Sequence, residues 1–243
     1  MRPYAHALRL LALALITSGS GAAAQSTASY VVDQTGALAD ADRQSLSDRL
    51  AALDDSTAVQ IVVVTMDLLG APIADAALFG LNQMRLGQAG LNNGVLVPLA
   101  PADRAVHVSV GTGLEWQIPD SVAAAAVDLM LPYFRDGEYA GGLGVGVDAL
   151  SKWAASVPWG VRFGSAAEAV AAGPAAVGEV ARVRGVYADG ALQTEAGPVA
   201  LAFPPYWSQA HPTPQPGGAL DLLARVVGAE PLAVQVLGLA PGR

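Results

Sequence analysis

Hydrophobic positions follow two different periods along the first two thirds of the chain. Residues 59–65 read VQIVVVT, a nearly continuous β-branched run that is typical of a strand buried on both faces. Residues 40–54 have leucines on one helical face, and Asp40 stands where it can cap this helix. Three further helices are predicted at residues 73–86, 121–131 and 139–155. Strands that alternate with helices predict an α/β sandwich.

Two predicted strands follow each other in the middle of the chain. Residues 94–100 and 105–110 are joined by Pro-Ala-Asp-Arg, which is a turn sequence. Because so short a turn joins only antiparallel strands, the sheet is expected to be mixed. Pro98 removes a ladder donor, so the first strand should be bulged or at an edge there. Pro132 should end the helix that precedes it. The expected fold is a three-layer α/β sandwich with a mixed sheet.

The last third of the chain has shorter apolar runs. The segments VARVRGVY, ALQT and PVALAFP are predicted strands, ALDLLARVVG at residues 219–228 a predicted helix, and LAVQVLGLAP a final strand. We expect a small β-rich domain over residues 180–243. Pro158-Trp159-Gly160 and a stretch rich in alanine and glycine precede it, so the boundary is placed near residue 158 and a linker over residues 159–179.

Charge is scarce and mostly acidic. Hydrophobic residues make up 53% of the chain and charged residues 14%, so a sizeable core is expected. Residues 25–158 carry 15 acidic and 6 basic side chains, a formal charge of −9, whereas residues 159–243 carry 6 and 5, a charge of −1. A nucleic-acid binder needs a basic surface to neutralise phosphates, so nucleic acid is not expected as a partner.

The first 24 residues have the layout of a secretory signal peptide. Arg2 and Arg9 make the start weakly basic, and an apolar run follows. Ala22-Ala23-Ala24 then gives a cleavage site after Ala24. No later stretch of 18 apolar residues without charge follows, so no membrane anchor is expected after cleavage. With a single lysine and much alanine, glycine and arginine, the composition favours a bacterial chain. We therefore expect a periplasmic or secreted protein that folds without cysteine.

Common enzyme motifs do not occur in the sequence. It has no GxSxG, HExxH or GxxxxGK[ST], and the GxGxxA match at residues 144–149 lacks a preceding strand. No nucleotide or organic cofactor is therefore predicted. His107 lies in the VHVSV segment and is interpreted as a half-buried strand residue rather than a catalytic acid.

Polar residues gather at the outer ends of the predicted hairpin. Asn92 and Asn93 precede its first strand, Glu115 follows its second, and Asp120 opens the next helix. Calcium takes about 6–8 oxygen ligands, and carboxylate and amide oxygens in converging loops suit it. Asn93, Glu115 and Asp120 are the main candidates, with Asn92 and Asp33 weaker ones. The alternative is that Asn93-Gly94 forms a turn and Asp120 caps the helix.

Several blocks in order give the first part a recognisable pattern. They are VVDQTGAL (31–38), NNGVLVPLA (92–100), VHVSVGTGLE (106–115), IPD (118–120) and LPYFRDGEYAGGLGVGVDAL (131–150). Over about residues 30–157 the chain resembles the TPM domain family, the thylakoid-lumen acid-phosphatase-like domain. The resemblance implies a compact, Rossmann-like three-layer fold, export, membrane-protein partners, calcium binding and, in some members, acid phosphatase activity. The chain departs from the family at Asn92, where an acid is usual, and at Thr112, where tyrosine is frequent.

The last third also carries a resemblance. Residues 180–243 are similar to the first half of a staphylococcal-nuclease-like OB barrel, with Asp189-Gly190 as the turn between early strands. Ala191 stands where the nuclease has an acid, and PVALAF contains no arginine, so nuclease activity is predicted to be lost. The chain is expected to end before such a barrel is complete. An unrelated small β domain is the alternative.

Two functions follow from these observations. The first is an exported binding or assembly module for an envelope or membrane protein, linked to calcium. The second is a metal-assisted acid phosphatase, for which Arg104 and Arg135 are the arginines that could meet a phosphate. A structural helper with neither metal nor activity is a third interpretation.

Overall fold

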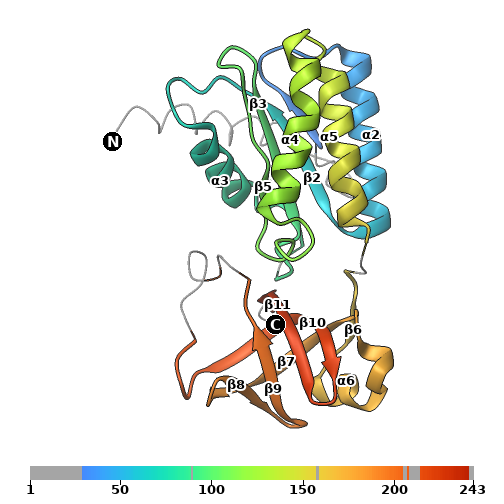
Figure 1. Ribbon diagram of the computed structural model, residues 1–243, viewed down its shortest axis with the longest axis vertical. Coiled ribbons are helices and arrows are strands. Elements are labelled where there is room, and N and C mark those ends of the chain that lie inside the picture. Colours follow the sequence, from blue (N-terminus) through green and yellow to red (C-terminus); the bar gives the residue numbers. More distant parts are fainter. Residues whose placement is uncertain (1–28, 89, 157–158, 205–206, 208–213, 241–243) are drawn as a thin grey trace, which may run out of the picture.

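The chain folds into an α/β domain and a β-barrel that pack against each other end to end (Figure 1). The computed structural model describes residues 29–88, 90–156, 159–204, 207 and 214–240. The expected signal peptide, residues 1–24, lies outside the described residues. An α/β sandwich followed by a β-rich part confirms the fold class expected from the sequence.

The sheet of the α/β domain is mixed, as predicted. Its strands are β1 (Val31–Asp33), β2 (Gln60–Thr65), β3 (Gly94–Ala100), β4 (Ala105–Val106) and β5 (Ser109–Val110). Strands β1, β2 and β3 are parallel neighbours, whereas β4 and β5 both pair antiparallel with β3. The amino end of β3 and the carboxyl end of β5 therefore lie at the same end of the sheet, the end that faces the barrel.

The helices cover the two faces of this sheet unequally. Helices α2 (Asp40–Thr57), α4 (Asp120–Arg135) and α5 (Tyr139–Ala154) share one face, and α3 (Ile73–Met84) lies on the other (Figure 1). Alternate residues of β2 serve the two faces: Ile61 and Val63 join the core under α2, α4 and α5, whereas Val62 and Val64 join the smaller core under α3. No helix in the described part of the chain combines the length and apolar character that a membrane crossing needs.

Two local predictions about the helices were wrong, the Asp40 cap and the end at Pro132, and the alternative role of Asp120 as a cap is not observed either. The N-cap residues are Ala39 for α2 and Pro119 for α4, without a side-chain cap, so Asp40 and Asp120 are first-turn residues. There each carboxylate is placed favourably with respect to the helix dipole. Pro132 does not end α4, which continues to Arg135. The helix tolerates this proline because it lies on the exposed face, where water can bond the carbonyl that loses its partner.

The expected strand over residues 105–110 is interrupted at His107 and Val108. The backbone N–H of His107 donates to the carbonyl oxygen of Pro98 at 3.1 Å. In a strand, the N–H and C=O of one residue point to the same side, so the donor that Pro98 lacks would have faced this segment. The ladder therefore breaks into β4 and β5. Pro98 itself lies inside the sheet, with β2 on its other side.

The C-terminal part is a closed barrel. Its elements are β6 (Val161–Phe163), α6 (Ala166–Ala172), a 3-10 turn (Gly173–Ala176), β7 (Val180–Ala188), β8 (Ala191–Thr194), β9 (Gly197–Ala202), β10 (Ala219–Ala229) and β11 (Leu232–Leu239). The order β10-β11-β9-β8-β7 closes through a β10–β7 pairing, and β6 pairs parallel with the start of β7. Residues 159–179, expected as a linker, thus contain β6, α6 and the 3-10 turn, and Ala166 and Ala169 are buried in the barrel core.

The predicted helix at residues 219–228 is strand β10. It pairs with β7 along one edge and with β11 along the other. Leu222, Ala224 and Val226 fill the barrel, whereas Leu223 on the opposite face joins the core of the α/β domain. A run buried on both faces lacks the strand period, so its leucines and alanines read as a helix. This strand also closes the barrel that we expected to be incomplete. OB folds are likewise built as five-stranded barrels.

Candidate functional site

The cleft of the α/β domain lies at the end of the sheet that faces the barrel. It has a volume of about 820 Å³ and runs between α3 and the segment from β4 to the start of α4. Leu78, Leu81 and Leu86 form an apolar wall, and Ile118 lies across from them. The polar residues that line it are Asn82, Arg85, Gln88, Asn92, His107, Ser109, Thr112, Glu115 and Asp120. The cleft thus combines apolar walls with a short row of charged and amide side chains.

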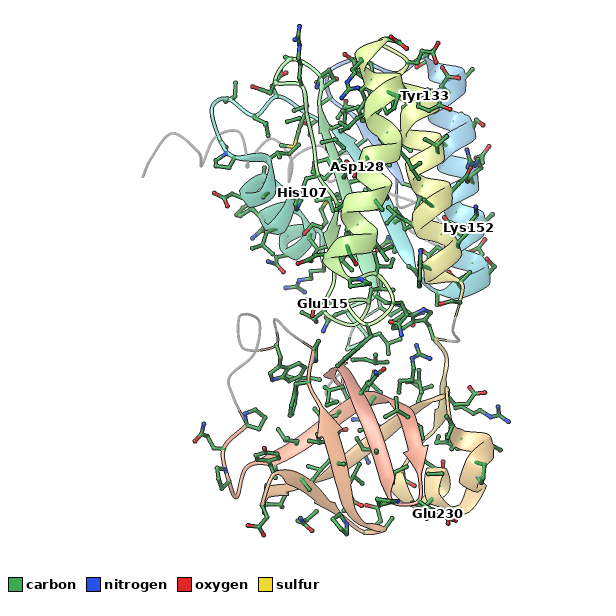
Figure 2. All side chains as sticks on the ribbon, viewed as in Figure 1. His107, Glu115, Asp128, Tyr133, Lys152 and Glu230 are labelled. Atoms are coloured by element: carbon green, nitrogen blue, oxygen red, sulfur yellow. The ribbon has the colours of Figure 1, made fainter. Side chains whose placement is uncertain are left out.

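Three of the five predicted site residues line this cleft. Glu115 comes from the turn after β5, Asp120 from the first turn of α4, and Asn92 from the loop before β3. Figure 2 shows Glu115 at the edge of the α/β domain nearest the barrel and His107 further up, beside α3. The hairpin therefore brings its two outer ends together, as the sequence predicted.

His107 is a cleft residue rather than a member of a strand. It is half-buried between β4 and β5 and faces the cleft. Burial lowers the pKa of its imidazole below the ordinary 6.5, and the negative charge of Asp120 opposes this shift in part. The imidazole is therefore neutral at pH 7 and can both donate and accept a hydrogen bond.

Asn93 does not reach the cleft. It is fully buried, its Nδ2 donates to the carbonyl oxygen of Ala58, and its Oδ1 accepts from the backbone N–H of Gln88 at 2.7 Å. Both ends of the amide are therefore used in tying the loop before β3 to the loop before β2. This geometry makes Asn93 a structural residue that does not line the cleft.

Asp33 lies at the opposite end of the sheet from the cleft, because it is the last residue of β1. One of its oxygens accepts from the backbone N–H of Gly36 at 2.9 Å, the other from that of Leu38 at 3.0 Å, and the hydroxyl of Thr65 also donates to it. Burial alone would raise the pKa of Asp33, but these hydrogen bonds outweigh it and lower the pKa below 3.8. The side chain organises the turn after β1 and takes no part in the cleft.

The loop that carries Asn92 is held by glycines. A Cβ built on Gly113 would overlap the carbonyl oxygen of Leu91, and one on Gly111 would overlap that of Asn92. The N–H of Gly113 donates to Asn92 at 3.1 Å, and that of Gly111 to Gly94 at 2.8 Å. Residues 111 and 113 are therefore glycines because the loop backbone comes too close for any side chain.

A family comparison matches this part of the chain. The TPM domain model aligns with residues 31–153, from β1 almost to the end of α5. The chain belongs to the TPM domain family. The matched residues hold the whole cleft, whereas the barrel lies outside them.

Three solved structures resemble the TPM domain of this chain, all determined by NMR. The N-terminal domain of a P. gingivalis protein is 37% identical and covers 51% of this chain and 81% of its own, with a TM-score of 0.48. The N-terminal domain of the cg2496 protein of Corynebacterium glutamicum is 17% identical, with coverages of 60% and 96% and a TM-score of 0.46. The BA42 protein of Bizionia argentinensis is 19% identical, with coverages of 51% and 86% and a TM-score of 0.46. The search of curated proteins gives no match.

The cleft of the TPM domain offers a cation less than the sequence suggested. Glu115 and Asp120 are two carboxylates, but Asn93 and Asp33 are engaged elsewhere. Among the described residues, no group of three His, Cys, Asp or Glu side chains is placed to hold a metal ion. Because calcium affinity follows the number of charged ligands, these side chains do not fit a tight calcium site.

The arginines predicted to meet a phosphate are both outside the cleft. Arg104 lies in the turn after β3 and Arg135 in the last turn of α4, at the end of the domain away from the cleft. Arg85, which follows α3 and which sequence analysis had missed, lines the cleft instead. The only sequence signal for it was a basic residue at the end of an amphipathic helix, where such residues usually complement the dipole.

Proposed function

We propose that this chain is an exported binding module whose TPM domain receives a segment of an envelope protein partner in its cleft. The observation that supports this proposal most strongly is the lining of the cleft, in which leucines of α3 face a row of hydrophilic side chains. Ligand sites of proteins commonly combine apolar walls with a few polar groups that fix orientation. Export itself is proposed from the signal-like sequence of residues 1–24.

The partner segment should carry apolar side chains and a lysine or arginine. Leu78 is 53% exposed and Phe79 37% exposed, so α3 presents apolar surface at the rim of the cleft and beside it. Glu115 and Asp120 place two negative charges at the other side, against one positive charge from Arg85. Residues 25–158 carry a formal charge of −9, which attracts a basic segment over a longer range.

A peptide-binding experiment tests this function. The whole chain is applied to an array of short peptides in which apolar residues are combined with either lysine or glutamate. We expect binding to the apolar, lysine-containing peptides, and loss of that binding in Leu78→Asp. Leu129→Asp is a matched control, because Leu129 on α4 is 52% exposed and lies outside the cleft. Equal binding to both peptide classes, or an equal effect of the two variants, would contradict the proposal.

An acid phosphatase is the second candidate, and one observation favours it. Arg85, His107 and Asp120 line the same cleft, so an arginine, an imidazole and a carboxylate are available together. The test is hydrolysis of p-nitrophenyl phosphate between pH 4 and 7 by the wild type, Arg85→Ala and Arg104→Ala. Activity that falls in Arg85→Ala but not in Arg104→Ala would establish this function. Hydrolysis no faster than in buffer without protein would rule it out.

A further inference from the structure

The loop that carries Asn92 touches the barrel as well as its own domain. Gly238, near the end of β11, packs against this loop. A Cβ built on Gly238 would overlap the carbonyl oxygen of Gly90 and lie 2.8 Å from Nδ2 of Asn92. Gly238 does not have a positive φ, so close approach and not backbone conformation is what requires a glycine here.

The same loop is thus in close contact with both domains. Gly111 and Gly113 of the TPM domain lie against the backbone of Leu91 and Asn92, and Gly238 of the barrel lies against that of Gly90. Contacts between backbones are stiff, because no side-chain rotamer can yield to relieve them. A displacement of the barrel therefore moves the backbone of residues 90–92, and with it Asn92, which lines the cleft.

The barrel is attached firmly enough to act through this contact. Val180, Leu223 and Leu237 of the barrel belong to the same hydrophobic cluster as the core of the TPM domain. Trp159, 1% exposed, belongs to it as well, with its indole N–H donating to Ala154 at 3.2 Å. The guanidinium of Arg225, on β10, lies 5.0 Å from the ring centroid of Trp159, which adds a cation–π contact.

We infer that the barrel sets the shape of the TPM-domain cleft by holding the Gly90–Asn92 loop through Gly238. The barrel is then a positioning element for the ligand site, and a partner that pulls on the barrel alters the cleft. The biological meaning of this coupling rests on the proposed binding function, but the coupling itself does not require that a peptide binds.

Amide hydrogen exchange of the whole chain tests the coupling without any ligand. The variant is Gly238→Ala, and the matched control is Gly228→Ala in the paired strand β10, where the nearest atom to a new Cβ is that of Ala233 at 3.4 Å. The reporters are the amides of Leu91 and Asn92, which donate to Gln88, and those of Gly111 and Gly113. We expect Gly238→Ala to accelerate exchange at these four amides by about tenfold or more, and Gly228→Ala to leave them unchanged.

The other outcomes also decide the matter. Unchanged exchange at the four reporter amides in Gly238→Ala overturns the inference. If this variant instead unfolds the barrel, seen as fast exchange at Val234 and Val236, continued protection of the reporters overturns it and their loss of protection supports it. Coupling is reciprocal, so Gly113→Ala, which places a Cβ against the carbonyl oxygen of Leu91, should accelerate exchange at Leu239 and Ala240. No effect there would also overturn the inference. Failure of peptide binding leaves all of these readouts unaffected.

Discussion

The replacement of Asn93 by alanine separates the structural role of this residue from the metal role that the sequence suggested. The change removes a fully buried amide with a hydrogen bond at each end, one to the carbonyl of Ala58 and one from the N–H of Gln88. Each net hydrogen bond contributes about 1 kcal/mol, and a buried group left without a partner costs about 1–3 kcal/mol. The carbonyl and N–H that lose Asn93 are only partly shielded, so water recovers some of this. We expect a loss of about 2–4 kcal/mol in the free energy of unfolding.

Urea unfolding of the whole chain, followed by circular dichroism, measures this loss. Asn82→Ala is the control, because Asn82 is an exposed residue of α3 at the rim of the same cleft. Surface changes of this kind usually alter stability by no more than about 0.5 kcal/mol. A cost below about 1 kcal/mol for Asn93→Ala would refute the structural assignment. Such a result together with an abolished calcium signal would return Asn93 to the ligand set.

Three further predictions concern the ionisable residues. Because the pKa of His107 is lowered in the folded state, the unfolded chain binds more protons than the folded chain below about pH 6.5. The free energy of unfolding should therefore fall as the pH drops through that value. In an NMR titration, Asp120→Asn should lower the pKa of His107 further. Calcium titrated into the whole chain by calorimetry should give only weak, saturable heat that disappears in both Glu115→Gln and Asp120→Asn; tight binding that survives both changes would place calcium elsewhere. Asp33→Asn should destabilise by about 1–3 kcal/mol in urea without altering calcium heat, since its oxygens only organise the turn after β1; an altered heat would link Asp33 to the cleft.

The sequence predicted the TPM domain well because its elements have distinct periods. The β-branched run of β2 indicates a buried strand, and the leucine face of α2 indicates a helix. Glu115 and Asp120 were also placed together correctly, because a hairpin brings its outer ends to one edge of the sheet. The inward turn of Asn93 was missed, since an asparagine before a glycine is far more often an exposed turn residue. Nothing in one sequence shows that its amide will replace two backbone partners.

The barrel was harder to predict, because its strands do not alternate. β10 is buried from Leu222 to Val226, with one face inside the barrel and the other against the TPM domain. Its residues have good helix propensity, and it forms a strand because it pairs with β7 and β11. The role of Arg85 was missed for a related reason: its place in the cleft follows from how α3 lies on the sheet, which no local pattern contains.

The hydrophobic cluster shared by the two parts has a consequence for the order in which the chain is made. The TPM domain emerges from the ribosome first, whereas Leu223 and Leu237, which complete its cluster, come near the end. At about 5–20 residues per second, the barrel takes on the order of ten seconds to follow. During that interval the nascent chain exposes apolar surface that its own later strands will cover. Chaperones that hold nascent chains should therefore bind this protein longest just before β10 is released.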